Sequence, residues 1–248
     1  MKRFDSIAHI YDSEIPDHIR TYLVRRKTGF ILRRIESLSK PSGLDVGCGT
    51  GWHIRSLAEH GFKMTGLDSS KDQVANAKEN NQNSNSNLLV GDALKCPFAD
   101  NQFDFVYSIN MMHHLKTKEN QLEMFTEIDR LLKPEGYFFL HEINTLNPIF
   151  RFYMNHIFPV LNRIDDGTEE WIRPDKLTDI GNLYLLSTDY FTFLPNFTPK
   201  ICFGTFKLVE RILERTPLKR FSAHYMATFQ KKQRLITESA EKKVIGYR

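Results

Sequence analysis

The sequence LDVGCGTG at residues 44–51 decides the fold class of this chain. A short apolar run is followed at once by Gly47, Gly49 and Gly51, and a helical pattern then continues to about residue 60. Glycines in a strand-to-helix turn let backbone amides approach a ligand closely, because they carry no β-carbon. The stretch therefore predicts a strand, a turn that can bind a ligand, and a helix.

More strand patterns follow, each separated from the next by a helical or polar segment. We expect further strands at 62–68, 87–92, 103–109 and 137–143, helices at 17–38, 70–80 and 118–133, and a solvated loop over NNQNSNSN at 80–87. Strands that alternate with helices at this spacing indicate right-handed βαβ units. The sequence thus predicts an α/β fold with a doubly wound, Rossmann-like parallel sheet.

The alternating pattern stops after residue 143. We expect an inserted helical cap over the carboxyl ends of the strands, where open α/β sheets bind ligands. The tail predicts a helix near 176–185, a strand near 188–194, a helix over about 200–215 and a last strand at 222–230. These parts form one predicted domain over 1–248, with a lid and helix at 1–40, a cofactor-binding core at 42–143, a cap and acceptor region at 144–198, and a C-terminal helix and strand at 199–248.

Composition excludes several classes of protein. The 248 residues are 41% hydrophobic and 26% charged, with a net charge of +4, which is ordinary globular composition and not that of a polycation. The three cysteines form no CxxC pair, so neither a disulfide framework nor a structural zinc site is expected. No segment has a signal-peptide pattern or the roughly 20 apolar residues of a membrane span. We expect a cytoplasmic protein with at most peripheral membrane contact.

The basic first helix has two interpretations. It could favour an anionic acceptor or a membrane surface, or it could simply be a solvated helix face. Its basic residues are Arg20, Arg25, Arg26, Lys27, Arg33 and Arg34.

Three carboxylates follow or end successive predicted strands. Asp45 lies beside the glycine turn, where it suits a cationic amino-acid group better than a pyrophosphate. Asp68, 17 residues after Gly51, lies where a carboxylate reaches both hydroxyls of a ribose, and Asp92 can accept a hydrogen bond from an adenine amino group. A lone aspartate after a strand is more often a turn or capping residue, but the three together match one ligand. NAD is disfavoured because Trp52 stands where its fingerprint needs a third glycine.

The motifs LDVGCGTG, GLDSS, VGDA, FDFVYSINMMHHL and LLKPEGYFFLHE, in this order, resemble those of class I S-adenosylmethionine-dependent methyltransferases. Within that family the chain is similar to the type 11-like group that acts on small molecules or lipids. The resemblance covers roughly 42–143, with a weaker match at FDSIAHIYD near the N-terminus. It implies S-adenosylmethionine as the cofactor and a seven-stranded sheet whose last strand, supplied here by 222–230, is antiparallel.

The resemblance also implies which residues hold the cofactor. Cys48 is expected there as a small residue of the turn, not as a reactive thiol. Tyr11 could close over the cofactor as part of a lid, with simple packing as an equal alternative. The implied cofactor-binding residues are Tyr11, Asp45, Gly47, Cys48, Gly49, Gly51, Asp68, Ser69, Asp92, Ala93 and Asn110.

Methyl transfer from a sulfonium is an in-line displacement, so alignment matters most and a base is needed only if the acceptor must lose a proton. His113 is the first candidate for a base or an acceptor-orienting group, and His141 is the second. His114 and Glu142 are their neighbours in the sequence. For each histidine the alternative is a buried, hydrogen-bonded structural group.

Aromatic residues of the insert predict a small, apolar or lipid-like acceptor, unless they form a second hydrophobic cluster. They are Phe150, Phe152, Tyr153, Phe158 and four more at 190–197. A nucleic-acid substrate is not expected, because SINMM lacks the Asn/Asp-Pro-Pro-aromatic signature, and no metal is expected, because Asn110 and His113 form no carboxylate cluster. Alternatives are a cofactor-binding protein without transferase activity and an NAD-dependent oxidoreductase. The oligomeric state stays open.

Overall fold

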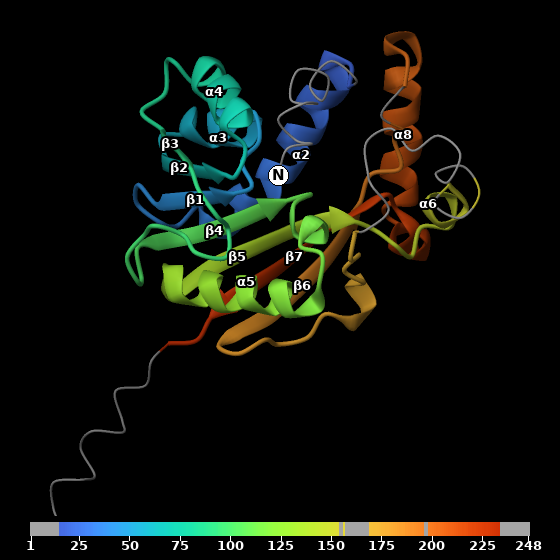
Figure 1. The fold of residues 1–248 in the computed structure, drawn as a ribbon. Coiled ribbons are helices and arrows are strands. Elements are labelled where there is room, and N and C mark those ends of the chain that lie inside the picture. The colour runs from blue at the N-terminus through green and yellow to red at the C-terminus, as the bar shows by residue number, and fades with distance from the viewer. Residues whose placement is uncertain (1–14, 154–155, 157–168, 196–197, 234–248) are drawn as a thin grey trace, which may run out of the picture.

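The computed structural model describes residues 15–153, 156, 169–195 and 198–233, and its centre is a seven-stranded sheet (Figure 1). The strand order is β3-β2-β1-β4-β5-β7-β6, and β7 runs antiparallel to both β5 and β6, while all other neighbouring strands are parallel. The predicted α/β fold, with its seven strands and its antiparallel last strand, is confirmed. The strands are β1 (Ser42–Val46), β2 (Lys63–Asp68), β3 (Asn87–Val90), β4 (Phe103–Ile109), β5 (Leu132–Ile143), β6 (Leu183–Phe191) and β7 (His224–Lys231).

Helices cover both faces of the sheet, as Figure 1 shows. Helices α2 (Asp17–Ile35), α3 (Trp52–Ala58) and α4 (Lys71–Asn80) lie on one face, and α5 (Lys118–Leu131) lies on the other. Two further helices, α6 (Pro148–Phe152) and α8 (Phe203–Leu213), lie beyond one end of the sheet. Among the described residues, no helix combines the length and the apolar composition that a bilayer crossing requires.

The central strand β4 shows why its sequence FDFVYSI is almost continuously apolar. Phe105 and Tyr107 pack in the core on the side of α2 and α3, while Val106 packs in the core on the side of α5. All three side chains are fully buried. A strand that is covered on both faces cannot carry the polar residues of a half-exposed strand.

The part after β5 differs from the sequence-based expectation. The helix predicted near 176–185 is wrong, because a 3₁₀ turn at Pro174–Lys176 is followed by a tight turn and by β6. Gly181 there has a φ of +58°, and the Ile180 and Leu183 backbones pair across the turn. A glycine with positive φ favours such a turn over a helix. The strand predicted near 188–194 therefore begins earlier, at the start of β6.

The described part of the 144–198 insert is less helical than predicted. It contains α6, which has five residues, the 3₁₀ turn and β6, while residues 157–168 lie outside the described residues. The helix expected over 200–215 is present as a short 3₁₀ segment, Lys200–Cys202, followed by α8. A second 3₁₀ segment, Pro217–Phe221, leads into β7.

The contact between β1 and β4 leaves no room for a side chain at Gly43. A β-carbon built there lies 2.2 Å from Cζ of Phe105, which is fully buried. We expect Gly43→Ala to lower the free energy of unfolding by about 1–3 kcal/mol, because the ring and backbone must shift. Gly204→Ala is the matched control, since a β-carbon there meets nothing within 4 Å and alanine favours a helix. Urea unfolding measures both variants, and equal stabilities would contradict this packing.

Candidate functional site

A cavity of about 690 Å³ opens at the carboxyl ends of β1 to β4. It collects ten of the eleven residues that the sequence assigned to the cofactor, and Tyr11 lies outside the described residues. The turn after β1 and the carboxyl ends of β2, β3 and β4 supply these residues. The ten are Asp45, Gly47, Cys48, Gly49, Gly51, Asp68, Ser69, Asp92, Ala93 and Asn110.

The turn between β1 and α3 is built from backbone. The amides of Gly47 and Cys48 donate to the carbonyl of Leu67 at 2.8 and 3.1 Å. Gly47 and Gly51 have φ values of +79° and +78°, and a β-carbon on Gly47 would lie 2.3 Å from Cγ of Met111. Only glycine combines this conformation with this space. The turn thus brings backbone close to the cavity.

Asp68, at the end of β2, fixes the middle of that turn. Its carboxylate accepts hydrogen bonds from the backbone amides of Gly49 and Ser70, each at 2.9 Å. Ser70 in turn caps α4 by accepting from the amide of Gln73 at 3.2 Å. Asp68 lines the cavity and is only partly buried, so its carboxylate can also meet the hydroxyl groups of a ligand.

Asp45 is 2% exposed and lies at the cavity wall. Burial raises the pKa of its carboxyl group well above the usual range, and the nearby charge of Asp68 raises this pKa further. A cationic group bound in the cavity would favour the ionised form of Asp45. Burial also raises the pKa of the Cys48 thiol, so Cys48 is a small turn residue and not an activated nucleophile.

Asn110 offers the cavity a hydrogen-bond acceptor. It follows β4 with a φ of +52°, and its amide donates to the carbonyl of His141 at 3.0 Å. Its side-chain oxygen is buried and has no hydrogen-bond partner among the described residues. On the far side, Asp92 lines the cavity after β3 and accepts from the amide of Leu94 at 2.9 Å. The set fits a ligand that carries an ammonium, a ribose and an exocyclic amine, as S-adenosylmethionine does.

The other wall of the cavity comes from α2, and the sequence-based reasoning missed it. Leu23 and Val24 give this wall an apolar surface, and the guanidinium of Arg20 lies over the Trp52 ring, 4.6 Å from its centroid. The apolar spacing of the helix was visible in the sequence, but it did not show which side faces a ligand. The one local indication in the sequence was Trp52, which follows the glycine turn directly and so could be expected near the cavity.

Lys27 lies at the base of the α2 wall and is 6% exposed. Among the described residues, its ammonium takes part in no hydrogen bond or ion pair. Burial lowers the pKa of Lys27 to about 8, and attraction to the charge of Glu142 partly opposes this decrease. A buried ammonium without a partner is costly, so a bound anionic oxygen would stabilise it.

Three histidines lie close to Lys27, of which His141 is fully buried and His53 and His224 are partly buried. His53 lines the cavity, whereas His141 and His224 lie deeper, with their ring centroids 5.0 Å apart. Burial lowers the pKa of all three, to about 3 for His224, and the charge of Lys27 lowers each further. Both ring nitrogens of His141 lack a hydrogen-bond partner among the described residues. These imidazoles are therefore neutral at physiological pH.

His113 does not line the cavity, and neither does His141. The Nδ1 atom of His113 lies 2.5 Å from a carboxylate oxygen of Glu142, and its ring stacks on Trp171 with centroids 4.5 Å apart. Glu142 also accepts from the amides of Met112 and His113. This pair fixes the loop after β4, and His114, the next residue, lines the cavity instead.

The described aromatic residues that were expected in the acceptor wall do not line the cavity. Phe150 packs against Trp171 at 5.2 Å, Phe152 and Tyr153 are exposed, and Phe191 is in the core. Phe158 and Phe197 lie outside the described residues. The described part of the insert contributes Glu169 to the cavity but none of these aromatics.

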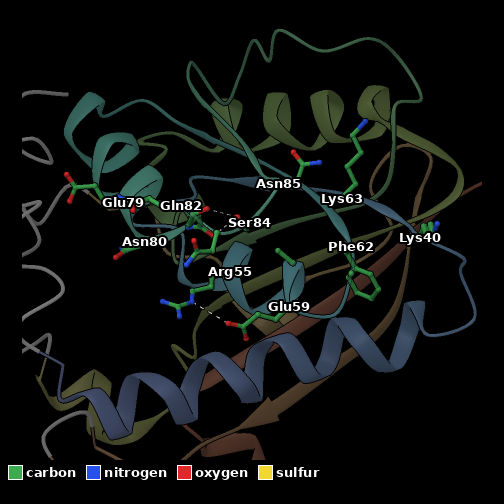
Figure 2. Close-up of a pocket in the computed structure, with 14 residues that line it drawn as sticks. Lys40, Arg55, Glu59, Phe62, Lys63, Glu79, Asn80, Gln82, Ser84 and Asn85 are labelled. Atoms are coloured by element: carbon green, nitrogen blue, oxygen red, sulfur yellow. Dashed lines mark hydrogen bonds and ion pairs between the residues drawn. The ribbon is translucent and has the colours of Figure 1, made fainter.

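A second hollow, of about 710 Å³, is shown in Figure 2. It lies near the amino end of β2, between the end of α3 and the loop after α4. Most of the residues that line it are polar or charged, and they include the exposed ion pair of Arg55 and Glu59 at 3.3 Å. It contains none of the predicted site residues, so the first cavity is the candidate site. Within the described ranges, no group of three acidic, histidine or cysteine side chains could hold a metal ion.

Part of the chain is similar to known methyltransferases. Residues 44–140 match the family model described as "Methyltransferase domain". The chain is 38% identical over 104 residues to 24-methylenesterol C-methyltransferase 3 of Arabidopsis thaliana, covering 40% of this chain and 28% of that protein. It is 30% identical over 152 residues to demethylmenaquinone methyltransferase of Staphylococcus haemolyticus, covering 54% and 62%. The chain thus spans less than two thirds of the length of these curated relatives.

A solved structure shares the fold over nearly the whole chain. It is described as a complex between the Trm112 methyltransferase activator of Haloferax volcanii and a "putative methyltransferase". The TM-score is 0.67 at 20% identity, with 94% of this chain and 98% of that chain covered. At this identity the likeness shows the fold.

The neutral buried histidines predict how stability depends on pH. In the unfolded chain a histidine has a pKa of about 6.5, so below that pH the unfolded state binds protons that the folded state excludes. The contribution of the neutral His224 side chain to the free energy of unfolding is therefore fully present above the unfolded-state pKa. It decreases as the pH falls from there towards about 3, the folded-state pKa of His224. When the pH is lowered from 7.5 to 5.5, the free energy of unfolding should decrease in both proteins. The decrease should be about 1.4 kcal/mol smaller in His224→Phe than in the wild type, because the variant lacks this titrating group.

The measurement is urea unfolding at both pH values. Phe191→Leu is the control, because Phe191 packs against His224 but does not titrate, and its effect should be equal at both. An unchanged pH dependence in His224→Phe would show that this imidazole is accessible to protons.

Proposed function

We propose that the protein is a class I S-adenosylmethionine-dependent methyltransferase and that it transfers a methyl group to a small, largely apolar acceptor. The match of residues 44–140 to the family model described as "Methyltransferase domain" supports this proposal. The observation that carries this proposal is the single cavity in which ten predicted cofactor residues meet an apolar wall from α2. The cofactor supplies the electrophilic methyl group. The protein's task is to hold both reactants in line and to exclude water.

The cofactor half of the cavity has a role for each carboxylate. Asp45 is buried beside the glycine turn, where it would hold the ammonium of the methionine part. Asp68 would bind the ribose hydroxyls, and Asp92 with Ala93 would border the adenine. Trp52 takes the position of the third glycine of a dinucleotide site, which argues against the oxidoreductase alternative.

The acceptor half is the space beside α2. Ile15, Leu23, Val24 and Leu115 line it with apolar groups, which would exclude water from the reacting atoms. The two relatives described above are named for a sterol and for demethylmenaquinone, which supports an acceptor with a large apolar part. A cofactor-binding protein without transferase activity is the alternative, and it would bind the cofactor without methylating any acceptor.

Polar side chains in the acceptor half of the cavity suggest how a bound acceptor would be oriented. His114 lines the cavity and would contact the acceptor, while the His113–Glu142 pair positions the loop that carries His114. His113 is therefore proposed as a positioning residue. Lys27 would attract an anionic oxygen, so we propose an acceptor that loses a proton at the group that lies next to Lys27.

Asp68→Ala should weaken binding of S-adenosylhomocysteine by about tenfold or more, because hydrogen bonds to a charged partner contribute about 1.5–3 kcal/mol. Asp72→Ala is the matched control, since Asp72 is an exposed aspartate in the first turn of α4. Calorimetric titration with S-adenosylmethionine, S-adenosylhomocysteine and NAD measures the three affinities. Folded wild-type protein that bound neither sulfur compound would rule out the proposed function.

Lys27→Met should leave the affinity for S-adenosylhomocysteine within about twofold and reduce binding of decanoate, an apolar anionic probe, by about tenfold. Decanol should bind both proteins equally, and Lys27→Arg should retain decanoate binding. Decanoate binding to the wild type should weaken as the pH rises through about 8, because Lys27 then loses its charge. A selective loss of S-adenosylhomocysteine binding in Lys27→Met would instead place the carboxylate of the cofactor at Lys27.

A further inference from the structure

Helix α8 buries a charged residue and exposes apolar ones, which is the opposite of an ordinary amphipathic surface helix. Its one buried side chain is Glu210, which is 1% exposed. Leu208, Val209 and Ile212, which are neighbours on the helix surface, are 56%, 47% and 56% exposed. A surface helix of a globular protein normally buries its apolar side and exposes its charges. Two questions follow for α8: which interactions hold it in this orientation, and what its exposed apolar side can contact.

The cause is a network of hydrogen bonds on the inner side of α8. The Glu210 carboxylate accepts from the hydroxyl groups of Tyr22 and Thr192, from Arg26 at 3.1 Å and from two backbone amides. Glu214, one turn later, pairs with Arg26 at 2.8 Å and accepts from the Thr192 amide at 2.8 Å. Rotating α8 to bury its apolar side would break all of these contacts and leave buried charges unpaired.

The consequence is an apolar surface that the rest of the described chain does not cover. We define the α8 face as Ile201, Leu208, Val209 and Ile212, of which Ile201 is 92% exposed. Phe206 and Leu218 nearby are 43% and 50% exposed. Contiguous exposed apolar side chains on a soluble protein commonly mark an interaction site.

The charges around the α8 face have one sign. Between residues 199 and 221 the only acidic residues are Glu210 and Glu214, and both are turned inward and paired. The exposed charged residues of this segment are Lys200, Arg211, Arg215, Lys219 and Arg220. The face therefore combines apolar side chains with an uncompensated positive charge.

We propose that the α8 face docks the protein on the surface of an anionic lipid bilayer. An apolar stripe bordered by basic residues suits the interface, where the apolar side chains enter the headgroup region and the cations meet lipid phosphates. With 11 residues, α8 lies in the interface and does not cross the membrane. A second copy of the chain fits less well, because its equivalent face would bring the same positive charges into contact.

Docking also has a geometric consequence for the cavity. The inner side of α8 packs on α2 through Tyr22 and Arg26, and the neighbouring residues Leu23 and Lys27 line the cavity. A bilayer bound at α8 therefore lies one helix away from the acceptor wall. This relation would suit an acceptor that partitions into lipid, but the docking itself does not depend on the proposed function.

Flotation of the 248-residue chain with phosphatidylglycerol vesicles and with phosphatidylcholine vesicles tests the proposal. We expect binding to the anionic vesicles and binding to the neutral vesicles that is weaker by about tenfold or more. About 0.5 M salt should release the protein from the anionic vesicles, because it shortens the Debye length and screens the attraction between the basic residues and the lipid phosphates. Leu208→Gln with Ile212→Gln should lower the partition coefficient for anionic vesicles about tenfold or more. The matched control is Leu122→Gln with Leu186→Gln, two apolar residues elsewhere that are 55% and 43% exposed.

Binding of S-adenosylhomocysteine serves as the folding check and should be unchanged in both double variants. The proposal is wrong if the wild type does not float with anionic vesicles, or if the α8 variant floats as the wild type does. A dimer in solution that the α8 variant converts to a monomer would show that a second copy covers this face instead. Because the lipid and cofactor assays are separate, failure of docking leaves the proposed methyl transfer untouched, and the reverse holds too.

Discussion

The two hydrogen bonds that the Asp68 carboxylate accepts, from the amides of Gly49 and Ser70, hold the site together. They join the turn after β1 to the start of α4, and so fix the ends of neighbouring strands relative to each other. The parallel sheet brings these ends to one edge, but only the turn geometry aims backbone and carboxylates into one cavity. A small displacement there would move the cofactor and the acceptor out of line.

The cavity has two electrostatic halves. Asp68 and Asp92 make the half at the strand ends acidic, and Asp45 adds a buried carboxyl group there that a bound cation would ionise, while Arg20 and Lys27 make the α2 wall basic. The buried histidines near Lys27 are neutral and so add no further positive charge. With a pKa of about 8, Lys27 keeps most of its charge at neutral pH inside a wall that is otherwise largely apolar. A methyl acceptor with an acidic group would bring the charge that this half lacks.

The cofactor half was predictable from sequence because its residues follow the strands within a few positions, where topology alone places them together. The α2 wall was not, because Leu23 and Lys27 meet the cavity only through packing with segments that lie far along the chain. His113 and His114 are adjacent, and only the 3₁₀ turn after β4 decides that His114 lines the cavity. The helix expected near 176–185 failed because the turn at Gly181 outweighed an apparent helical pattern.

Helix α8 shows a further limit of pattern analysis. Its amphipathic spacing predicts a helix correctly, but such spacing leaves open which side faces inward. That choice depends on Tyr22 and Arg26, about 190 residues earlier in the chain, which pair with Glu210. Since Tyr22 and Arg26 are one turn apart on α2, and Leu23 and Lys27 follow them one residue on, the same two turns orient α8 and line the cavity. A change in how α8 is bound would therefore reach the acceptor wall through a single rigid helix, without any movement of the sheet.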